Sequence, residues 1–220
     1  MHLEMRWHHP DGVRLPVAVW CPGPGWRMIS SGVAGGGIGP REWVLNAQVA
    51  ASYSRMDPAA HVAELAGGLG LGGEGVGLLT AASVADMVQC EDDGAHAAAT
   101  VGLRIPAWAA APPGTADREL APAWRPGTIN IIVSVPVPLS DAAYVGAVMT
   151  ATEAKTQAVL EAGFHATGTA SDAICVAAPA AGRPQDFAGP RSLWGARLAR
   201  AVHAAVHAGA LSYRAKSNPA

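Results

Sequence analysis

The fold is decided by the stretch Gly-Thr-Ile-Asn-Ile-Ile-Val at residues 127–133 and by the helix and strand that follow it. Side chains of alternating character give residues 128–135 the two-residue period of a β-strand. One face is apolar and is expected to pack in the core: Ile129, Ile131, Val133 and Val135. The other face carries polar groups among its members: Thr128, Asn130, Ile132 and Ser134. That second face has two interpretations, a solvent-exposed surface or the polar wall of a cleft.

A long helix is predicted over residues 141–162. Ser140 is placed to cap its first turn, Asp141 suits the positive end of the helix dipole, and Gly163 suits its C-terminal stop. Helical projection predicts one packed stripe, made of Val145, Val148, Met149, Thr152, Thr156, Val159 and Leu160. Glu153 and Lys155 fall on opposite borders of that stripe, so either could face a cleft without being fully buried.

A glycine turn and a second strand follow the predicted helix and complete a strand–helix–strand unit. The turn reads Ala-Thr-Gly-Thr-Ala-Ser-Asp-Ala at residues 166–173, and Asp172 opens a strand that runs to Val176. The hydroxyl groups of Thr167 and Thr169 could orient Asp172 or a ligand. Alternatively, Asp172 accepts hydrogen bonds from nearby backbone N–H groups and only stabilises the turn.

Several segments, in order along the chain, resemble the adenosylcobinamide amidohydrolase family. They are Gly-Gly-Gly-Ile-Gly at 35–39, Asn46 with Val49 and Tyr53, Thr-Ala-Ala-Ser at 80–83, residues 127–133, Ala-Thr-Glu-Ala-Lys-Thr at 151–156 and residues 166–173. The resemblance implies hydrolysis of the aminopropanol amide of a salvaged corrinoid, giving adenosylcobyric acid. Two segments depart from the pattern, the start up to about Arg14 and the proline-rich residues 106–126, which are expected to form a surface loop.

The remaining sequence predicts a single domain of α/β or α+β class, with a mixed sheet packed against helices. Residues 13–33 predict a β-hairpin or two successive strands, and residues 46–53 a short helix. Further helices are expected at 57–69 and 192–209, strands at 76–82, 87–89 and 99–105, and a flexible tail at 210–220. The order of the strands does not follow from the sequence.

Composition excludes some partners. The chain has 220 residues, half of them hydrophobic, and 15 basic against 17 acidic side chains give a net charge of −2. Such a balance predicts no broad electropositive face for nucleic acid. No segment resembles a signal peptide or a membrane span, so a cytoplasmic protein without membrane contact is expected. Assembly into a homo-oligomer is left open.

Two carboxylates are the predicted catalytic residues. Amide hydrolysis needs an activated nucleophile, stabilisation of the oxyanion and a proton for the departing amine. With the resemblance, Glu153 is expected to activate water and Asp172 to assist proton transfer or positioning; an acyl-enzyme route through a hydroxyl group is the less favoured alternative. Without a catalytic role, Glu153 would be a surface residue hydrogen-bonded to Gln157.

The predicted substrate-binding residues combine amides, hydroxyls and glycines: Asn46, Thr80, Ser83, Asn130, Thr169, Gly36 and Gly37. Either asparagine could instead satisfy buried backbone groups. No metal site and no cofactor are expected, because the cobalt would enter with the substrate; His203 and His207 lack the glutamate of a zinc-protease motif. The rival interpretation is a corrinoid carrier or sensor without catalytic activity.

Overall fold

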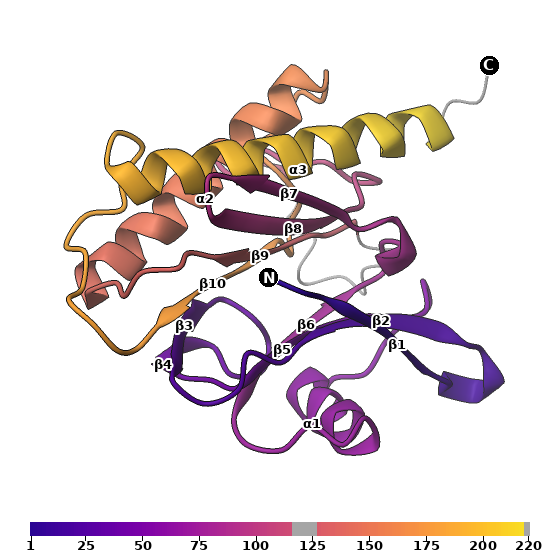
Figure 1. Ribbon diagram of the computed structural model, residues 1–220. Helices are drawn as coiled ribbons and strands as arrows, with labels where there is room; N and C mark the ends of the chain where they lie inside the picture. Colours follow the sequence, from indigo (N-terminus) through magenta and orange to yellow (C-terminus); the bar gives the residue numbers. More distant parts are fainter. Residues whose placement is uncertain (116–126, 218–220) are drawn as a thin grey trace.

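The computed structural model describes residues 1–115 and 127–217 as four stacked layers (Figure 1). Helix α1 covers the outer side of a four-stranded sheet, here called the first sheet. Helices α2 and α3 cover the outer side of a six-stranded sheet, here called the second sheet. The inner faces of the two sheets pack against each other.

The first sheet has the strand order β1-β2-β5-β6. Its strands are β1 Glu4–His8, β2 Leu15–Trp20, β5 Trp43–Gln48 and β6 Gly75–Thr80. The β5 and β6 strands are parallel and are connected through α1, Pro58–Gly68, whereas the other pairs are antiparallel. Trp43 and Leu45 on β5 belong to the same apolar cluster as Val62 and Leu65 on α1, so this cluster fixes the helix on the sheet.

The second sheet has the strand order β4-β3-β10-β9-β8-β7. Its strands are β3 Trp26–Ser30, β4 Gly37–Pro40, β7 Val88–Asp92, β8 Ala95–Val101, β9 Ile129–Ser134 and β10 Ala173–Pro179. Only β9 and β10 are parallel, and α2, Asp141–Glu161, connects them. The last helix, α3, is Leu193–Ser217, and two short 3-10 turns lie at Pro10–Gly12 and Val84–Asp86.

The second face of β9 lies between the two sheets. Ile132 packs there with Met28 and Leu78, whereas Asn130 is only 1% exposed and bonds to the first sheet. The face is therefore neither open to solvent nor the wall of an open cleft. A layer packed on each side of a sheet buries both faces of its strands, and the sequence of one strand does not show how many layers surround it.

The predicted α/β class and single domain are confirmed, as are the helices at 57–69 and 141–162. Ser140 caps α2 as expected, its hydroxyl accepting a hydrogen bond from Ala143 N at 3.2 Å. The helix predicted over residues 46–53 is wrong, because residues 43–48 form β5. The three- and four-residue spacing of Asn46, Val49 and Tyr53 is accidental, since the preceding apolar run is a strand buried on both faces.

The predicted packed stripe of α2 is also wrong in part. Val145 and Met149 are 50% and 59% exposed, whereas the buried positions are mainly small. Those buried residues are Ala143, Tyr144, Ala147, Thr150, Ala151, Ala154, Lys155, Ala158 and Val159. Small side chains let α2 lie close to α3 and to the sheet, and a pattern of large apolar residues does not reveal that face.

For residues 13–33 the alternative of two successive strands is confirmed, as β2 and β3, whereas the alternative of a hairpin is wrong because the two strands belong to different sheets. The end of the last helix also differs from the prediction. The last helix passes Gly209 and continues to Ser217, so most of the expected tail is helical. A Cβ at Gly209 would lie 2.7 Å from Val101 Cγ2, so this glycine serves close packing rather than helix termination.

The predicted surface loop at 106–126 is described only to residue 115, and the rest lies outside the described residues. Its first part pairs with another turn through a bridge between Ala107 and Gly168. No helix in the described part of the chain has the length and apolar character needed to cross a membrane.

Candidate functional site

Most of the segments that carry the family resemblance meet at one end of the two sheets, where β9 and β10 begin and β5, β6 and β8 end. Asn130 near the start of β9 is the register partner of Thr100 on β8 and of Ala173 on β10. Its side chain also reaches Leu79 O near the end of β6, at 3.0 Å. This region, the polar end, comprises Asn46, Thr80, Thr100, Thr128, Asn130, Lys155, Gly168, Thr169, Ser171 and Asp172.

Asp172 is the most heavily bonded side chain of the polar end. Oδ1 accepts hydrogen bonds from Thr169 Oγ1 at 2.5 Å and from Ile129 N at 3.0 Å. Oδ2 accepts from Lys155 Nζ at 2.5 Å and from Thr169 N at 3.1 Å. Four donors occupy the four acceptor positions of a carboxylate, so Asp172 has no position left for a water molecule. This arrangement supports a positioning role and fits the local turn-stabilising interpretation as well.

The turn that contains Thr169 is held rigidly beside the ion pair. A Cβ at Gly168 would overlap both Asp172 Oδ2 and Lys155 Nζ, so only glycine fits there. Thr167 Oγ1 accepts a hydrogen bond from Ala109 N at 2.7 Å, and Ala107 N donates to Gly168 O at 2.8 Å. Residues 107–109 therefore fix the turn from one side while the Asp172 contacts fix it from the other.

The two predicted asparagines are brought together inside the protein. Asn130 Nδ2 donates to Asn46 Oδ1 at 2.9 Å, and Asn46 Nδ2 donates to Thr100 Oγ1 at 3.1 Å. Both side chains are buried, at 0% and 1% exposure. These bonds join the first sheet to the second. Asn130 also satisfies a buried backbone carbonyl, Leu79 O, as the alternative interpretation expects, whereas the bonds of Asn46 given above go to side chains. Within the described residues, Asn130 Oδ1 has no hydrogen-bond partner.

The other predicted binding residues are spread around this end. Thr80 is buried and its hydroxyl accepts a hydrogen bond from Ala82 N at 3.0 Å, whereas Ser83 is exposed. Gly36 and Gly37 are exposed, and Gly37 pairs with Ser30, which is itself the register partner of Cys175 on β10. The glycine segment on β4 is thus separated from β9 by two strands, β3 and β10, in the second sheet, and lies at the edge of the polar end.

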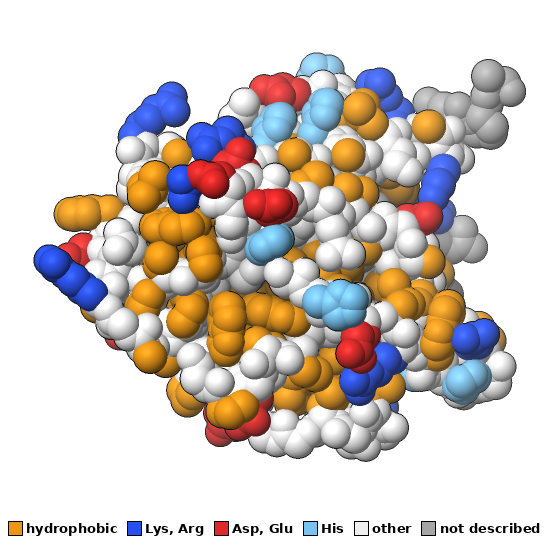
Figure 2. Space-filling view, in the orientation of Figure 1, with side chains coloured by type: hydrophobic (Ala, Val, Ile, Leu, Met, Phe, Trp, Pro, Cys, Tyr) orange, Lys and Arg blue, Asp and Glu red, His pale blue; other side chains and the backbone are white. Residues whose placement is uncertain are grey.

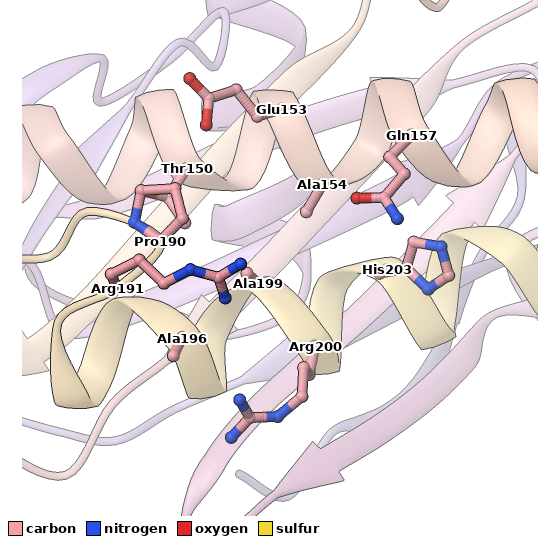
Figure 3. Close-up of a pocket in the computed structure, with 10 residues that line it drawn as sticks. All are labelled: Thr150, Glu153, Ala154, Gln157, Pro190, Arg191, Ala196, Ala199, Arg200 and His203. Atoms are coloured by element: carbon pink, nitrogen blue, oxygen red, sulfur yellow. The ribbon is translucent and has the colours of Figure 1, made fainter.

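Glu153 lies elsewhere. It lines an open groove of about 460 Å³ between α2 and α3, together with Gln157, Arg191, Arg200 and His203. Figure 3 shows Glu153 at the rim of this groove, with its carboxylate turned away from α3. Asp172 is not among the lining residues. The structure therefore does not bring the two predicted catalytic carboxylates to one site.

Lys155 of the 151–156 segment bonds to Asp172 at the polar end and was not among the predicted site residues; Thr156 of the same segment donates to Thr167 O in the neighbouring turn. Two residues on a helix are about 200° apart, so Lys155 and Glu153 point to opposite sides of α2. The Lys155 side chain is 9% exposed, which is rare for a lysine without a partner. Two features of the sequence could have indicated Lys155. It lies on the border of the apolar stripe opposite Glu153, and Asp172 in the following turn is a possible acidic partner.

No three histidine, cysteine or acidic side chains approach closely enough to hold a metal ion within residues 1–115 and 127–217.

Comparison with known proteins gives the family. The sequence profile of the adenosylcobinamide amidohydrolases (CbiZ) matches residues 4–218. The chain belongs to the adenosylcobinamide amidohydrolase family. The predicted resemblance is confirmed, and so is the predicted enzyme class, since the family is one of amide hydrolases. The match starts at residue 4, so the family region includes residues 4–14, which were expected to lie outside it.

Two curated relatives support this membership. The adenosylcobinamide amidohydrolase of Methanosarcina mazei is 32% identical over 193 residues, which cover 84% of this chain and 90% of the relative. The adenosylcobinamide amidohydrolase of Halobacterium salinarum is 39% identical over 115 residues, which cover 50% of this chain and 48% of the relative.

Proposed function

We propose that this protein hydrolyses the aminopropanol amide of adenosylcobinamide at the polar end, releasing adenosylcobyric acid and 1-aminopropan-2-ol for cobamide salvage. The observation that carries the proposal is the meeting of distant family segments at the buried Lys155–Asp172 pair. Water is the only co-substrate: its hydroxyl is added to the carbonyl carbon, the C–N bond breaks, and the remaining hydrogen goes to the amine nitrogen. The cobalt belongs to the corrinoid substrate.

Lys155 is the proposed catalytic residue. Its ammonium group has three N–H donors, and one of them binds Asp172 Oδ2. Another can bind the carbonyl oxygen of the scissile amide, where negative charge develops as the carbon becomes tetrahedral. A fixed cation in a partly buried position stabilises such charge more strongly than one in water.

Asp172 is a positioning residue in this proposal. The pair anchors Lys155, and the bonds to Thr169 and Ile129 N fix the carboxylate itself. Among the described residues, no other carboxylate is bonded to these groups, so Glu153 has no part in this mechanism. The predicted attack by water assisted by Glu153 is replaced here by attack of water on a carbonyl group that Lys155 polarises.

The decisive experiment compares Lys155→Met with Glu153→Gln in an assay that follows cobyric acid by mass. We expect Lys155→Met to lower kcat by about 10² or more, in the range for loss of one electrostatic group. Glu153→Gln should keep turnover within about threefold, because surface positions outside a site contribute little. Full activity of folded Lys155→Met, or loss of activity in Glu153→Gln, would reject the polar end as the reaction site.

Two further measurements separate the remaining alternatives. Stoichiometric binding of adenosylcobinamide without product would favour a corrinoid carrier or sensor over an enzyme. A covalent acyl adduct on Thr80 or Ser83, detected by mass after rapid quenching, would favour a hydroxyl nucleophile over water.

A further inference from the structure

A second hollow lies at the opposite end of the two sheets from the polar end. It has a volume of about 370 Å³ and opens where β2 and β9 end and β8 begins, with Trp20, Trp26, His96 and Ser134 in its lining. Figure 2 shows hydrophobic side chains gathered left of centre, where the two sheets of Figure 1 meet. His96 is four residues before Thr100 on β8, a separation of about 13 Å along the strand.

The walls of this hollow are flat and apolar. Trp20 and Trp26 lie edge to face, with ring centroids 5.0 Å apart and planes at 79°. Pro22 and Pro136 add rigid apolar surface. Aromatic faces of this kind bind other flat ring systems by stacking, which contributes about 1–3 kcal/mol for a nucleobase.

The polar groups of the hollow form a neighbouring pair. His96 on β8 is the register partner of Ser134 on β9, and both side chains lie on the inner face of the second sheet. Ser134 is only 4% exposed. Burial, and then the positive N-terminal amine, lower the pKa of His96, so its ring is neutral near pH 7 with one donor and one acceptor nitrogen.

We propose that this hollow binds a nitrogen heterocycle of the purine type, stacked against Trp26 and hydrogen-bonded along its edge by His96 and Ser134. Met1, which carries the N-terminal amine, also lines the hollow, whereas no acidic side chain, lysine or arginine is among its lining residues. Its volume falls near the lower limit of about 300–1,000 Å³ for small-molecule sites, which suits a nucleoside and excludes a corrin ring. The site is separate from the polar end, because the apolar cluster between the sheets lies between them.

Adenosine is the chosen probe, with ribose as the control that lacks the base. Calorimetric titration of the full chain should show saturable binding of adenosine and none of ribose. Ser134→Ala and His96→Leu should each weaken binding about 5- to 100-fold, the range for one or two lost hydrogen bonds. Trp26→Leu should weaken it further, whereas Trp7→Leu, an exposed tryptophan on β1 outside the hollow, should leave it unchanged.

The outcomes separate this site from the proposed reaction. Adenosine should still bind to Lys155→Met, and Ser134→Ala should still hydrolyse adenosylcobinamide. Absence of adenosine binding at millimolar concentration would overturn the second site and leave the proposed function intact. Binding that survives in folded Ser134→Ala, His96→Leu and Trp26→Leu would place adenosine elsewhere and would equally reject the inference.

Discussion

Lys155 Nζ lies 2.5 Å from Asp172 Oδ2, and each of the two side chains is only 9% exposed. This pair joins the middle of α2 to the residue that precedes β10. A lysine and an aspartate so deeply buried stabilise each other, and neither can lose its partner without leaving a desolvated charge.

Replacement of Asp172 should show the strength of this coupling. Asp172→Asn keeps the shape but removes the negative charge, so Lys155 is left as an uncompensated buried cation. We expect a loss of about 3–5 kcal/mol in the free energy of unfolding, measured with urea. Asp92→Asn breaks an exposed pair with Arg200 and should cost at most about 1 kcal/mol. Equal effects of the two changes would show that the buried pair is not special.

Gly168 gives a test of the geometry at the same place. In Gly168→Ala the new methyl group overlaps Asp172 and Lys155, so the turn must move. A destabilisation of about 1–3 kcal/mol and a clear loss of turnover are expected. The control is Gly67→Ala near the end of α1, where a Cβ has open space and the better helix propensity of alanine should stabilise by up to about 1 kcal/mol. Unchanged activity in Gly168→Ala would mean that the turn does not position the reaction.

The hydrogen bond between Asn46 and Asn130 predicts a loss of stability when one of these uncharged side chains is removed. Asn46→Ala leaves Asn130 Nδ2 and Thr100 Oγ1 with one bond fewer inside the protein, and burial of unpaired polar groups costs about 1–3 kcal/mol. Thermal unfolding should therefore show a lower Tm. Gln157→Ala, which removes an exposed bond to Glu161, should change Tm very little. A similar Tm in both variants would contradict a stabilising network between the sheets.

Close packing of α3 on β8 predicts that alanine destabilises the protein at one helical glycine and is tolerated at another. Gly209→Ala pushes a methyl group against Val101 and should destabilise by about 1–3 kcal/mol. Gly146→Ala in α2 has its nearest neighbours at 3.9 Å and should be neutral or stabilising. Comparison of the two midpoints in urea tests whether Gly209 is needed for contact with the sheet; stabilisation by Gly209→Ala would show that it is not.

His61 on α1 predicts a dependence of stability on pH. Burial first, and the charge of Arg55 second, lower the pKa of His61 in the folded protein from 6.5. The unfolded chain therefore takes up this proton more readily, so the stability that His61 contributes is complete above pH 6.5 and is lost as the pH falls from that value to the lower pKa of the folded state. His61→Gln should flatten the curve of unfolding free energy between pH 7 and pH 5. An unchanged slope would show that His61 does not titrate differently on folding.

The sequence predicted the elements whose signals are local. Ser140 marks the start of α2 and Pro58 the start of α1, because caps and prolines act on the backbone beside them. β9 was recognised for the same reason, since alternation of side chains is visible within one strand. The family resemblance identified the segments that meet at the polar end.

What the sequence did not show depends on neighbours in space. A helix was predicted at 46–53 from the spacing of Asn46, Val49 and Tyr53. The end of β5 lies there instead, and this strand shows no alternation because both of its faces are covered, one by α1 and the other by the second sheet. The position of β10 relative to α2 decides which side of the helix faces the site, and the sequence does not give that position. Glu153 was therefore predicted in place of Lys155. Residue spacing alone gives the angle between the two side chains, but it does not say which of them meets Asp172.

The chain passes back and forth between the two sheets, so the protein cannot be divided into two parts that each contain a whole sheet. β1 and β2 belong to the first sheet, β3 and β4 to the second, β5 and β6 to the first again, and the remaining strands to the second. A cut anywhere between β2 and β6 therefore leaves both fragments with incomplete sheets, and neither could fold as a module. Gene fusion, duplication or loss of half the protein would be tolerated only when it conserves the whole interleaved unit.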